Sequence, residues 1–243
     1  MKKNIVSAAF IIIGDEILSG RTNDQNLNFL AINLSTIGIN LREVRVVADI
    51  TQEIIDAINA LRHKFDYVFT SGGIGPTHDD ITSQSIAKAF NVKIELNKEA
   101  EEILHKHYGV DINEARLKMA MIPTGASLLN NPISSAPGFR IKNVFVMAGV
   151  PKIFQAMFAA AKKELIGGEK TLSQEIKINL VESKIAKDFE ELQKEYPNVT
   201  MGSYPFEGGT SLVFRSIDEK SLLTAKDLMT KKILAIKKDA III

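Results

Sequence analysis

The sequence predicts an α/β protein with a mostly parallel sheet, followed by a small α+β domain. Apolar runs of strand length alternate with segments whose apolar residues recur at helical spacing, in the order β-α-β-α-β through residue 70. The first run, residues 5–13, is apolar almost throughout, as strands covered on both faces are. After residue 168 the period changes to strand-like alternation, which indicates a second domain.

The elements of the first domain follow from this periodicity. Expected strands occupy residues 5–13, 41–47, 67–70 and 144–148. Expected helices occupy residues 27–37, 51–65, 81–90, 98–107, 113–121 and 153–165. Gly38 is a suitable stop for the first helix, and Thr51 is a good N-cap for the second. Ligands of such sheets bind at the carboxyl ends of the strands.

The second domain begins after a glycine pair. Gly167 and Gly168 mark the best candidate boundary, so the predicted domains are residues 1–166 and 171–243. Beyond the boundary we expect strands at residues 176–180, 199–205 and 212–217, and helices at residues 185–196 and 222–236. The order β-α-β-β-α makes a small α+β layer.

The stretch TSGGIGPTHDDIT, residues 70–82, connects the third strand to a helix. Its three glycines in four residues let the backbone approach a ligand and leave N–H groups free to bind it, and a following helix N-terminus favours phosphate. Asp79 and Asp80 would repel a bare phosphate, and a divalent cation between carboxylate and phosphate oxygens is the usual remedy. The stretch therefore indicates metal-assisted binding or cleavage of a phosphorylated small molecule.

An alternative interpretation needs no ligand. Thr77 and Asp80 fit the capping pattern S/T-x-x-D/E, and acidic residues in a first helical turn suit the helix dipole. Adjacent residues on a helix do not face the same way, so one aspartate is expected to be a ligand and the other either a cap or a group that supports the ligand from the second shell of the site. Capping alone explains the full thirteen-residue stretch poorly.

Composition excludes several classes of function. The chain has 30 basic and 29 acidic residues, which gives no electrostatic field suited to nucleic acid or a membrane surface. It has no cysteine, so disulfides, thiolate nucleophiles and cysteine-based zinc sites are excluded. Lys2-Lys3 and the apolar run that follows imitate a signal peptide, but no small-residue cleavage site follows them. We expect a cytoplasmic protein with no membrane-spanning segment.

The glycine-rich stretch resembles the signature GGxGPTxDDxT of the molybdopterin-binding-like domain in competence/damage-inducible protein A (CinA). Upstream, GDEILSG at residues 14–20, followed by Asp24 and Asn26, resembles the family motif GDELLxG…DxN. Downstream, further family landmarks occur in order, namely APGF at 136–139, GVP at 149–151 and GSYP at 202–205. The resemblance covers nearly the whole chain.

This resemblance implies a fold and an activity. The fold is a three-layer α/β/α molybdopterin-binding-like domain followed by a small KH-like domain. The activity is hydrolysis of ADP-ribose, or of a related dinucleotide such as FAD, to AMP and a sugar phosphate, with Mg, Mn or Co as the divalent metal. A homodimer is also implied. The open alternatives are a molybdopterin-binding or adenylylating protein and a non-enzymatic competence-associated module. The amidohydrolase domain of longer CinA proteins is not expected in 243 residues.

The resemblance also carries over individual site residues. The expected catalytic residues are Asp79, Asp80 and Glu16, and the expected metal ligands are Asp79, Asp80 and Asp15. The residues expected to contact substrate are Ser71, Gly72, Gly73, Gly75, Pro76, Thr77, Asp24, Asn26 and Lys118. This chain has KMA at residues 118–120 where the family often has Lys-Gln-Ala, and it lacks the acid that commonly follows GVP. Lys118 or Arg116 is the alternative source of positive charge if the aspartates only cap.

Overall fold

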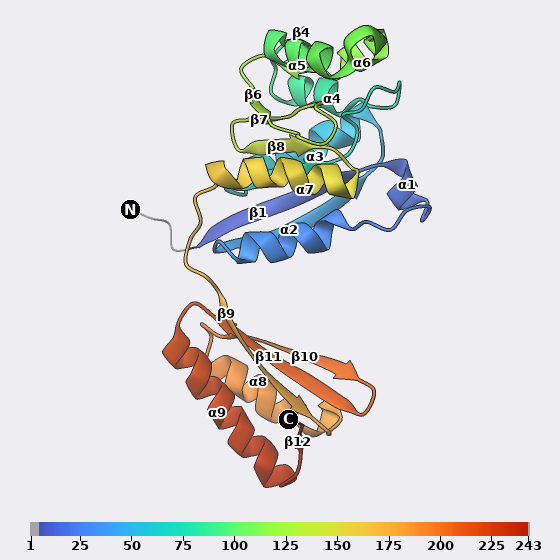
Figure 1. Ribbon diagram of the computed structural model, residues 1–243. Coiled ribbons are helices and arrows are strands. Elements are labelled where there is room, and N and C mark those ends of the chain that lie inside the picture. Colours follow the sequence, from blue (N-terminus) through green and yellow to red (C-terminus); the bar gives the residue numbers. More distant parts are fainter. Residues whose placement is uncertain (1–4, 243) are drawn as a thin grey trace. The chain divides into compact units, whose positions relative to one another are not determined.

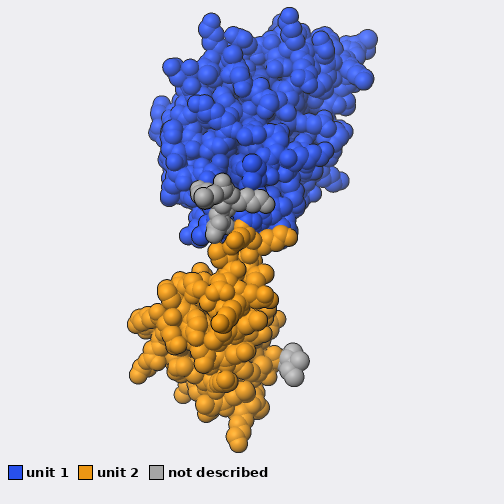
Figure 2. Space-filling model, turned by 90° about the vertical axis from the view of Figure 1, so that its left-hand side faces the viewer, with its two compact units in different colours: residues 1–168 blue, residues 169–243 orange. Residues whose placement is uncertain are grey.

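A computed structural model describes residues 5–242 of the chain. The chain divides into two compact units, residues 1–168 and 169–243, shown in different colours in Figure 2. The boundary lies at the glycine pair where the period of the sequence changes. None of the helices within residues 5–242 is long and apolar enough to cross a membrane.

Unit 1 is built around a mixed sheet. In the described part of the chain this sheet has six strands in the order β2-β1-β3-β8-β7-β6. Their bounds are β1 Val6–Ile13, β2 Ile39–Val47, β3 Tyr67–Ser71, β6 Ser127–Leu129, β7 Gly138–Ile141 and β8 Val144–Met147. The first four strands in this order run parallel, and β7 and β6 add an antiparallel hairpin at one edge.

Helices cover both faces of the sheet, which confirms the three-layer α/β/α arrangement (Figure 1). The bounds are α1 Asp15–Leu18, α2 Asn26–Ser35, α3 Thr51–Arg62, α4 Thr82–Ala89, α7 Pro151–Ala161 and the 3-10 turn η2 Lys162–Glu164. One core lies under α3 and α4, and the other lies under α2 and α7. Strand β1 supplies Ile11 to the first core and Phe10 to the second, which explains why its sequence is apolar at successive positions.

A small α/β insertion connects α4 to β6. It contains β4 Ile94–Leu96, α5 Lys98–Tyr108, η1 Gly109–Asp111, α6 Glu114–Lys118 and β5 Met121–Pro123. The side chains of Asn97 and Asn113 accept hydrogen bonds at the starts of α5 and α6 and so cap both helices. The expected helix over residues 113–121 was too long, because Met121 pairs in β5 with Leu96 of β4.

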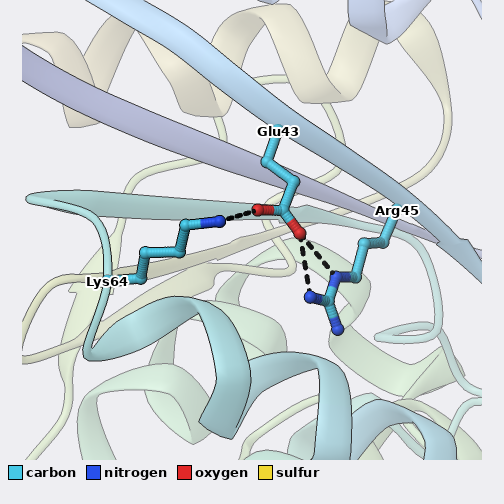
Figure 3. A network of polar contacts seen from close by, with 3 residues as sticks. All are labelled: Glu43, Arg45 and Lys64. Carbon is cyan, nitrogen blue, oxygen red and sulfur yellow. Dashed lines mark hydrogen bonds and ion pairs between the residues drawn. The ribbon is translucent and has the colours of Figure 1, made fainter.

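Strand β2 is an edge strand protected by charge. Glu43 accepts hydrogen bonds from the guanidinium of Arg45 at 2.8 Å and from the ammonium of Lys64 at 2.7 Å (Figure 3). Lys64 and then Arg45 lower the pKa of Glu43. Exposed ion pairs add little stability, but charges along an edge strand discourage pairing with another sheet.

Unit 2 is an antiparallel sheet with helices on one face. Its elements are β9 Leu172–Ile178, η3 Glu182–Lys184, α8 Ala186–Glu195, β10 Thr200–Phe206, β11 Gly209–Ser216, α9 Glu219–Ile236 and β12 Ile241–Ile242. The strand order is β10-β11-β9-β12, and the core lies between this sheet and the two α-helices. The small α+β layer is confirmed, and β12 is an additional strand that the periodicity did not predict.

We expect residues 1–168 to fold without unit 2. Both cores of unit 1 are made of unit 1 residues, and the core of unit 2 is made of unit 2 residues. The isolated segment should therefore unfold cooperatively on heating when followed by circular dichroism. A control segment of residues 1–143 lacks β8 and α7 and should not fold. An unfolded 1–168 segment would contradict the division.

Candidate active site

The carboxyl ends of the four parallel strands meet at one edge of the unit 1 sheet, as expected for such sheets. A pocket of about 600 Å³ opens there. The loops after β1, β2, β3 and β8 supply Gly14, Glu16, Asp49, Gly72, Gly73, Ile74, Gly75, Pro76, Asp79, Asp80, Ala148, Gly149 and Val150 to its lining. The two motifs, GDEILSG and the glycine-rich stretch, therefore line the same pocket.

Gly72 is a structural residue of this edge. A Cβ atom at this position would lie 2.1 Å from the carbonyl oxygen of Ile13, and its φ of +107° is one that other residues rarely adopt. Its N–H donates to the carbonyl of Met147 at 3.1 Å, and its carbonyl accepts from the hydroxyl of Thr82 at 3.0 Å. Gly72 therefore holds the loop close to β1, and its N–H is engaged within the protein. Gly72 also lines the pocket, and its contact with a substrate stays a prediction.

The three residues after Gly72 have backbone N–H groups that make no hydrogen bond within the described residues. The N–H of Thr82 donates to the carbonyl of Gly73 at 2.9 Å, so the first helical amide of α4 is engaged by the loop itself. Within residues 5–242, the N–H groups of Gly73, Ile74 and Gly75 donate no hydrogen bond. They are the backbone donors that a phosphate could use at this pocket.

Asp80 closes a turn and does not cap a helix. Its Oδ2 accepts from the N–H of Thr77 at 2.8 Å and also from the hydroxyl of Thr77. Helix α4 begins later, at Thr82, and has no acidic residue in its first turn. The helix-capping interpretation is therefore wrong. A Cβ atom at Gly75 would lie 2.6 Å from Asp80 Oδ2, so the turn packs closely on the glycine.

Asp79 is the exposed carboxylate of the pair, with 64% of its side chain accessible. The hydroxyl of Thr77 lowers the pKa of Asp79 most, and its own N–H, His78 and Lys118 lower it further. Asp79 is therefore ionised at neutral pH. Lys118 lies outside the pocket lining, and its ammonium donates to the carbonyl of Thr77, so it supports the loop.

Asp49 is a pocket residue that sequence reasoning missed. It follows β2 and lines the pocket with Glu16, Asp79 and Asp80, which makes four carboxylates among the described lining residues. Burial raises the pKa of Asp49 most, and the charges of Asp15, Glu16 and Asp79 raise it further, against a hydrogen bond from the N–H of Asp15 at 3.0 Å. Asp15, an expected metal ligand, is not part of the lining.

Replacing Asp49 by Asn should stabilise the folded protein at neutral pH. Because the pKa of Asp49 is raised on folding, its ionised form destabilises the fold above that pKa, and this penalty is lost as pH falls through it. The asparagine amide keeps an acceptor for the N–H of Asp15 without the charge. The Tm of Asp49→Asn should exceed that of the wild type at pH 7, and the difference should disappear as pH falls toward 3.8, the ordinary pKa. Glu102→Gln, at an exposed position, is the control. An equal rise of Tm in both variants would show that the raised pKa of Asp49 is not the cause of the stabilisation.

Three predicted substrate contacts lie behind the main pocket. The side-chain amide of Asn26 donates to the hydroxyl of Ser71 at 2.9 Å and to the carbonyl of Gly149 at 2.7 Å, so it ties the ends of β3 and β8 together. Asp24 accepts from the N–H of Leu27, in the first turn of α2, at 2.7 Å. These residues line a cavity of about 50 Å³ and not the large pocket. In this structure their hydrogen bonds hold neighbouring backbone segments, and their contact with a substrate stays a prediction.

The opposite wall comes from the insertion and from the hairpin between β6 and β7. It includes Tyr108, Arg116, Met119, Asn131, Ser134 and Ala136. The guanidinium of Arg116 lies 4.2 Å from the centre of the Tyr108 ring, which fixes its position by a cation–π contact. Arg116 is the one cation in the lining among residues 5–242.

The pocket has the oxygen donors that Mg²⁺ and Mn²⁺ prefer, because four carboxylates line it. In the described part of the chain, no three Asp, Glu, His or Cys side chains converge closely enough to hold an ion alone. The residues therefore fit an ion that completes its coordination with water and substrate phosphates, as Mg²⁺ often does. They do not form a closed metal cage.

Comparison with known proteins agrees with the fold and the motifs. Residues 9–167 match the family described as a probable molybdopterin binding domain. The chain belongs to this family. Residues 170–239, which are most of unit 2, match a second family described as the FAD synthase middle domain.

Individual relatives support the resemblance to CinA. A crystal structure of CinA from Thermoplasma acidophilum, described as a protein of unknown function, is similar with a TM-score of 0.63 and 35% identity, over 67% of this chain and 99% of that one. A protein of Archaeoglobus fulgidus is 33% identical over 89% of this chain and 94% of the relative. A probable FAD synthase of Caenorhabditis elegans is 32% identical over 82% of this chain, which spans 44% of that protein.

Proposed function

We propose that this protein hydrolyses the diphosphate of a dinucleotide such as ADP-ribose or FAD with the help of a divalent metal ion. The observation that carries the proposal is the lining of one pocket, which contains four carboxylates and the unengaged amides of Gly73, Ile74 and Gly75. A volume of about 600 Å³ is within the range of small-molecule sites.

Each group has a role in this proposal. The three amides bind non-bridging phosphate oxygens, and Arg116 neutralises charge from the opposite wall. Asp79, ionised and exposed, orients the attacking water. A divalent ion would be held by Asp79 together with Glu16 or Asp49, and it would lower the pKa of water and stabilise charge on phosphate. Asp80 and Lys118 keep the loop in shape through Thr77.

A second candidate function is adenylyl transfer, favoured by the match of residues 170–239 to the FAD synthase middle domain. Molybdopterin binding or adenylylation is favoured in the same way by the family of residues 9–167. Both would use the same pocket for a nucleotide phosphate. A non-enzymatic role would not explain why the pocket is lined by four carboxylates.

The homodimer and the cytoplasmic location stay predictions. Light scattering of the purified chain measures its mass in solution and so tests the homodimer.

One product assay separates these functions. The purified chain is incubated with ADP-ribose, with FAD, with FMN and ATP, or with molybdopterin and ATP, each with Mg²⁺, Mn²⁺ or Co²⁺ and each with excess chelator. Hydrolysis yields AMP from ADP-ribose or FAD without added ATP, whereas adenylylation consumes ATP and releases pyrophosphate. The absence of any product under all conditions would favour a non-enzymatic module.

Metal removal should stop hydrolysis and weaken ADP-ribose binding without unfolding the protein. A diphosphate carries about two negative charges, and the pocket adds four carboxylates against the single cation Arg116 among the described lining residues. Binding is measured by calorimetry and folding by circular dichroism, with and without chelator. Undiminished hydrolysis in excess chelator would contradict the metal-dependent proposal and would leave Arg116 as the source of positive charge in the pocket.

A further inference from the structure

The unit 2 sheet has a face that none of the described helices of unit 2 covers. Helices α8 and α9 lie on the other face, over the core of this unit (Figure 1). The strand registers place Tyr204, Ser211 and Lys177 in one row across β10, β11 and β9. The adjacent row contains Gly202, Val213 and Glu175, and Arg215 follows on β11. A shallow hollow of about 460 Å³ lies over these side chains.

Two aromatic rings lean over glycines on this face. A Cβ atom at Gly202 would lie 3.0 Å from the hydroxyl oxygen of Tyr204 and 3.1–3.2 Å from its ring atoms Cε2 and Cζ, and one at Gly209 would lie 3.1 Å from Cζ of Phe206. The rings therefore cover neighbouring backbone, as aromatic residues beside strand glycines do. Tyr204 remains 48% exposed and Phe206 41% exposed. Each ring therefore presents accessible π surface to the solvent.

Two exposed cations, Lys177 and Arg215, line the same hollow as the rings. Within residues 5–242, neither the side chain of Lys177 nor that of Arg215 has an ion pair or a hydrogen bond. The nearby acid, Glu175, accepts a hydrogen bond from the hydroxyl of Ser211 at 2.6 Å. Aromatic surface next to available cations is the combination that recognises a base and its phosphate.

We propose that this face binds a free nucleotide, with the base stacked on Tyr204 and the phosphate paired with Lys177 or Arg215. Charge favours a single nucleotide over a nucleic-acid strand, because residues 169–243 carry 12 Lys and Arg against 12 Asp and Glu. A polyanion is usually held by many cations, and this face offers two. The site is separate from the unit 1 pocket, and the proposal does not depend on the hydrolase function.

Site-resolved NMR on the full chain tests this proposal. With methyl-labelled valine, Val213 reports on the unit 2 face and Val150 reports on the unit 1 pocket. Titration with AMP or FMN should shift the Val213 methyl signals in a saturable way, whatever happens at Val150. Adenosine should bind this face more weakly than AMP. Unchanged Val213 signals at millimolar AMP and FMN would overturn the proposal. If only the Val150 signals shifted, the nucleotide would bind the unit 1 pocket alone, which is compatible with the proposed hydrolase function but not with a site on unit 2.

Variants identify the contacts. Tyr204→Leu keeps cover over Gly202 but removes the π surface, so the Kd for AMP at Val213 should rise about tenfold, whereas Tyr204→Phe should bind normally. Lys177→Gln with Arg215→Gln should abolish the preference for AMP over adenosine. Lys187→Gln, on α8 and therefore on the helix-covered side, is the matched control. Equal binding by Tyr204→Leu, or tight binding of a short single-stranded oligonucleotide without binding of AMP, would also overturn the proposal.

Discussion

The Asp79→Asn variant should lose dinucleotide hydrolysis by a factor on the order of a hundred or more while remaining folded. Asp79 is exposed and ionised, and its lowered pKa shows that its surroundings favour the charged form. Neutralising it removes the carboxylate that we propose orients the attacking water and holds the metal. Because so much of its side chain is accessible, the loss should leave the circular dichroism spectrum and Tm almost unchanged.

Asp80→Asn provides the comparison. The amide oxygen of asparagine can still accept from the N–H of Thr77, so the turn is weakened and not lost. We expect a loss of about tenfold, corresponding to a weakened charge-assisted hydrogen bond. The outer-surface variant Glu102→Gln should be fully active. Full activity of Asp79→Asn, in metal and at saturating substrate, would remove Asp79 from the mechanism.

Gly72→Ala should destabilise unit 1 by about 3 kcal/mol or more, or prevent its folding. The added Cβ atom would lie 2.1 Å from the carbonyl oxygen of Ile13, and both groups belong to backbone that cannot move without disturbing the pairing of β1 with β3. The left-handed φ adds strain. Unfolding in urea followed by circular dichroism measures the loss.

Gly20→Ala is the matched control for the glycine. Gly20 also has a positive φ, +73°, but a Cβ atom there would meet nothing within 4 Å. The cost should be about 1 kcal/mol, from backbone strain alone. If both variants lose equal stability, contact with Ile13 contributes nothing and the close approach of the loop to β1 is not what requires glycine.

Local sequence patterns were sufficient for the layered architecture. The continuous apolar run of β1 indicated a central strand, and the structure places Phe10 and Ile11 in cores on opposite faces. The periodicity also separated the two units near Gly168. It failed for β12, because two residues, Ile241 and Ile242, are too few to show a period.

The glycine-rich stretch shows where local rules were overridden. A Thr and an acid three residues apart predicted a helix cap, and the same pair closes a separate turn. The hydroxyl and N–H of Thr82 bind the carbonyls of Gly72 and Gly73, so the helix begins at Thr82. This competition depends on β3 and α4 meeting in the folded chain, which a capping motif does not encode.

By itself, the sequence determined the kind of site: carboxylates and glycine amides after two strands that end at the same edge. Only the tertiary structure decided which side chains reach the pocket. Asp49 enters because β2 lies next to β1 in the sheet, while Asp15 is left out and its N–H supports Asp49. The side chains of Asn26 and Ser71 form a hydrogen bond with each other and do not line the large pocket. The physical reason is that packing between segments far apart in the sequence sets the strand order and the backbone pairing. The strand order in turn decides which loops lie side by side at the sheet edge and which side chains reach the pocket.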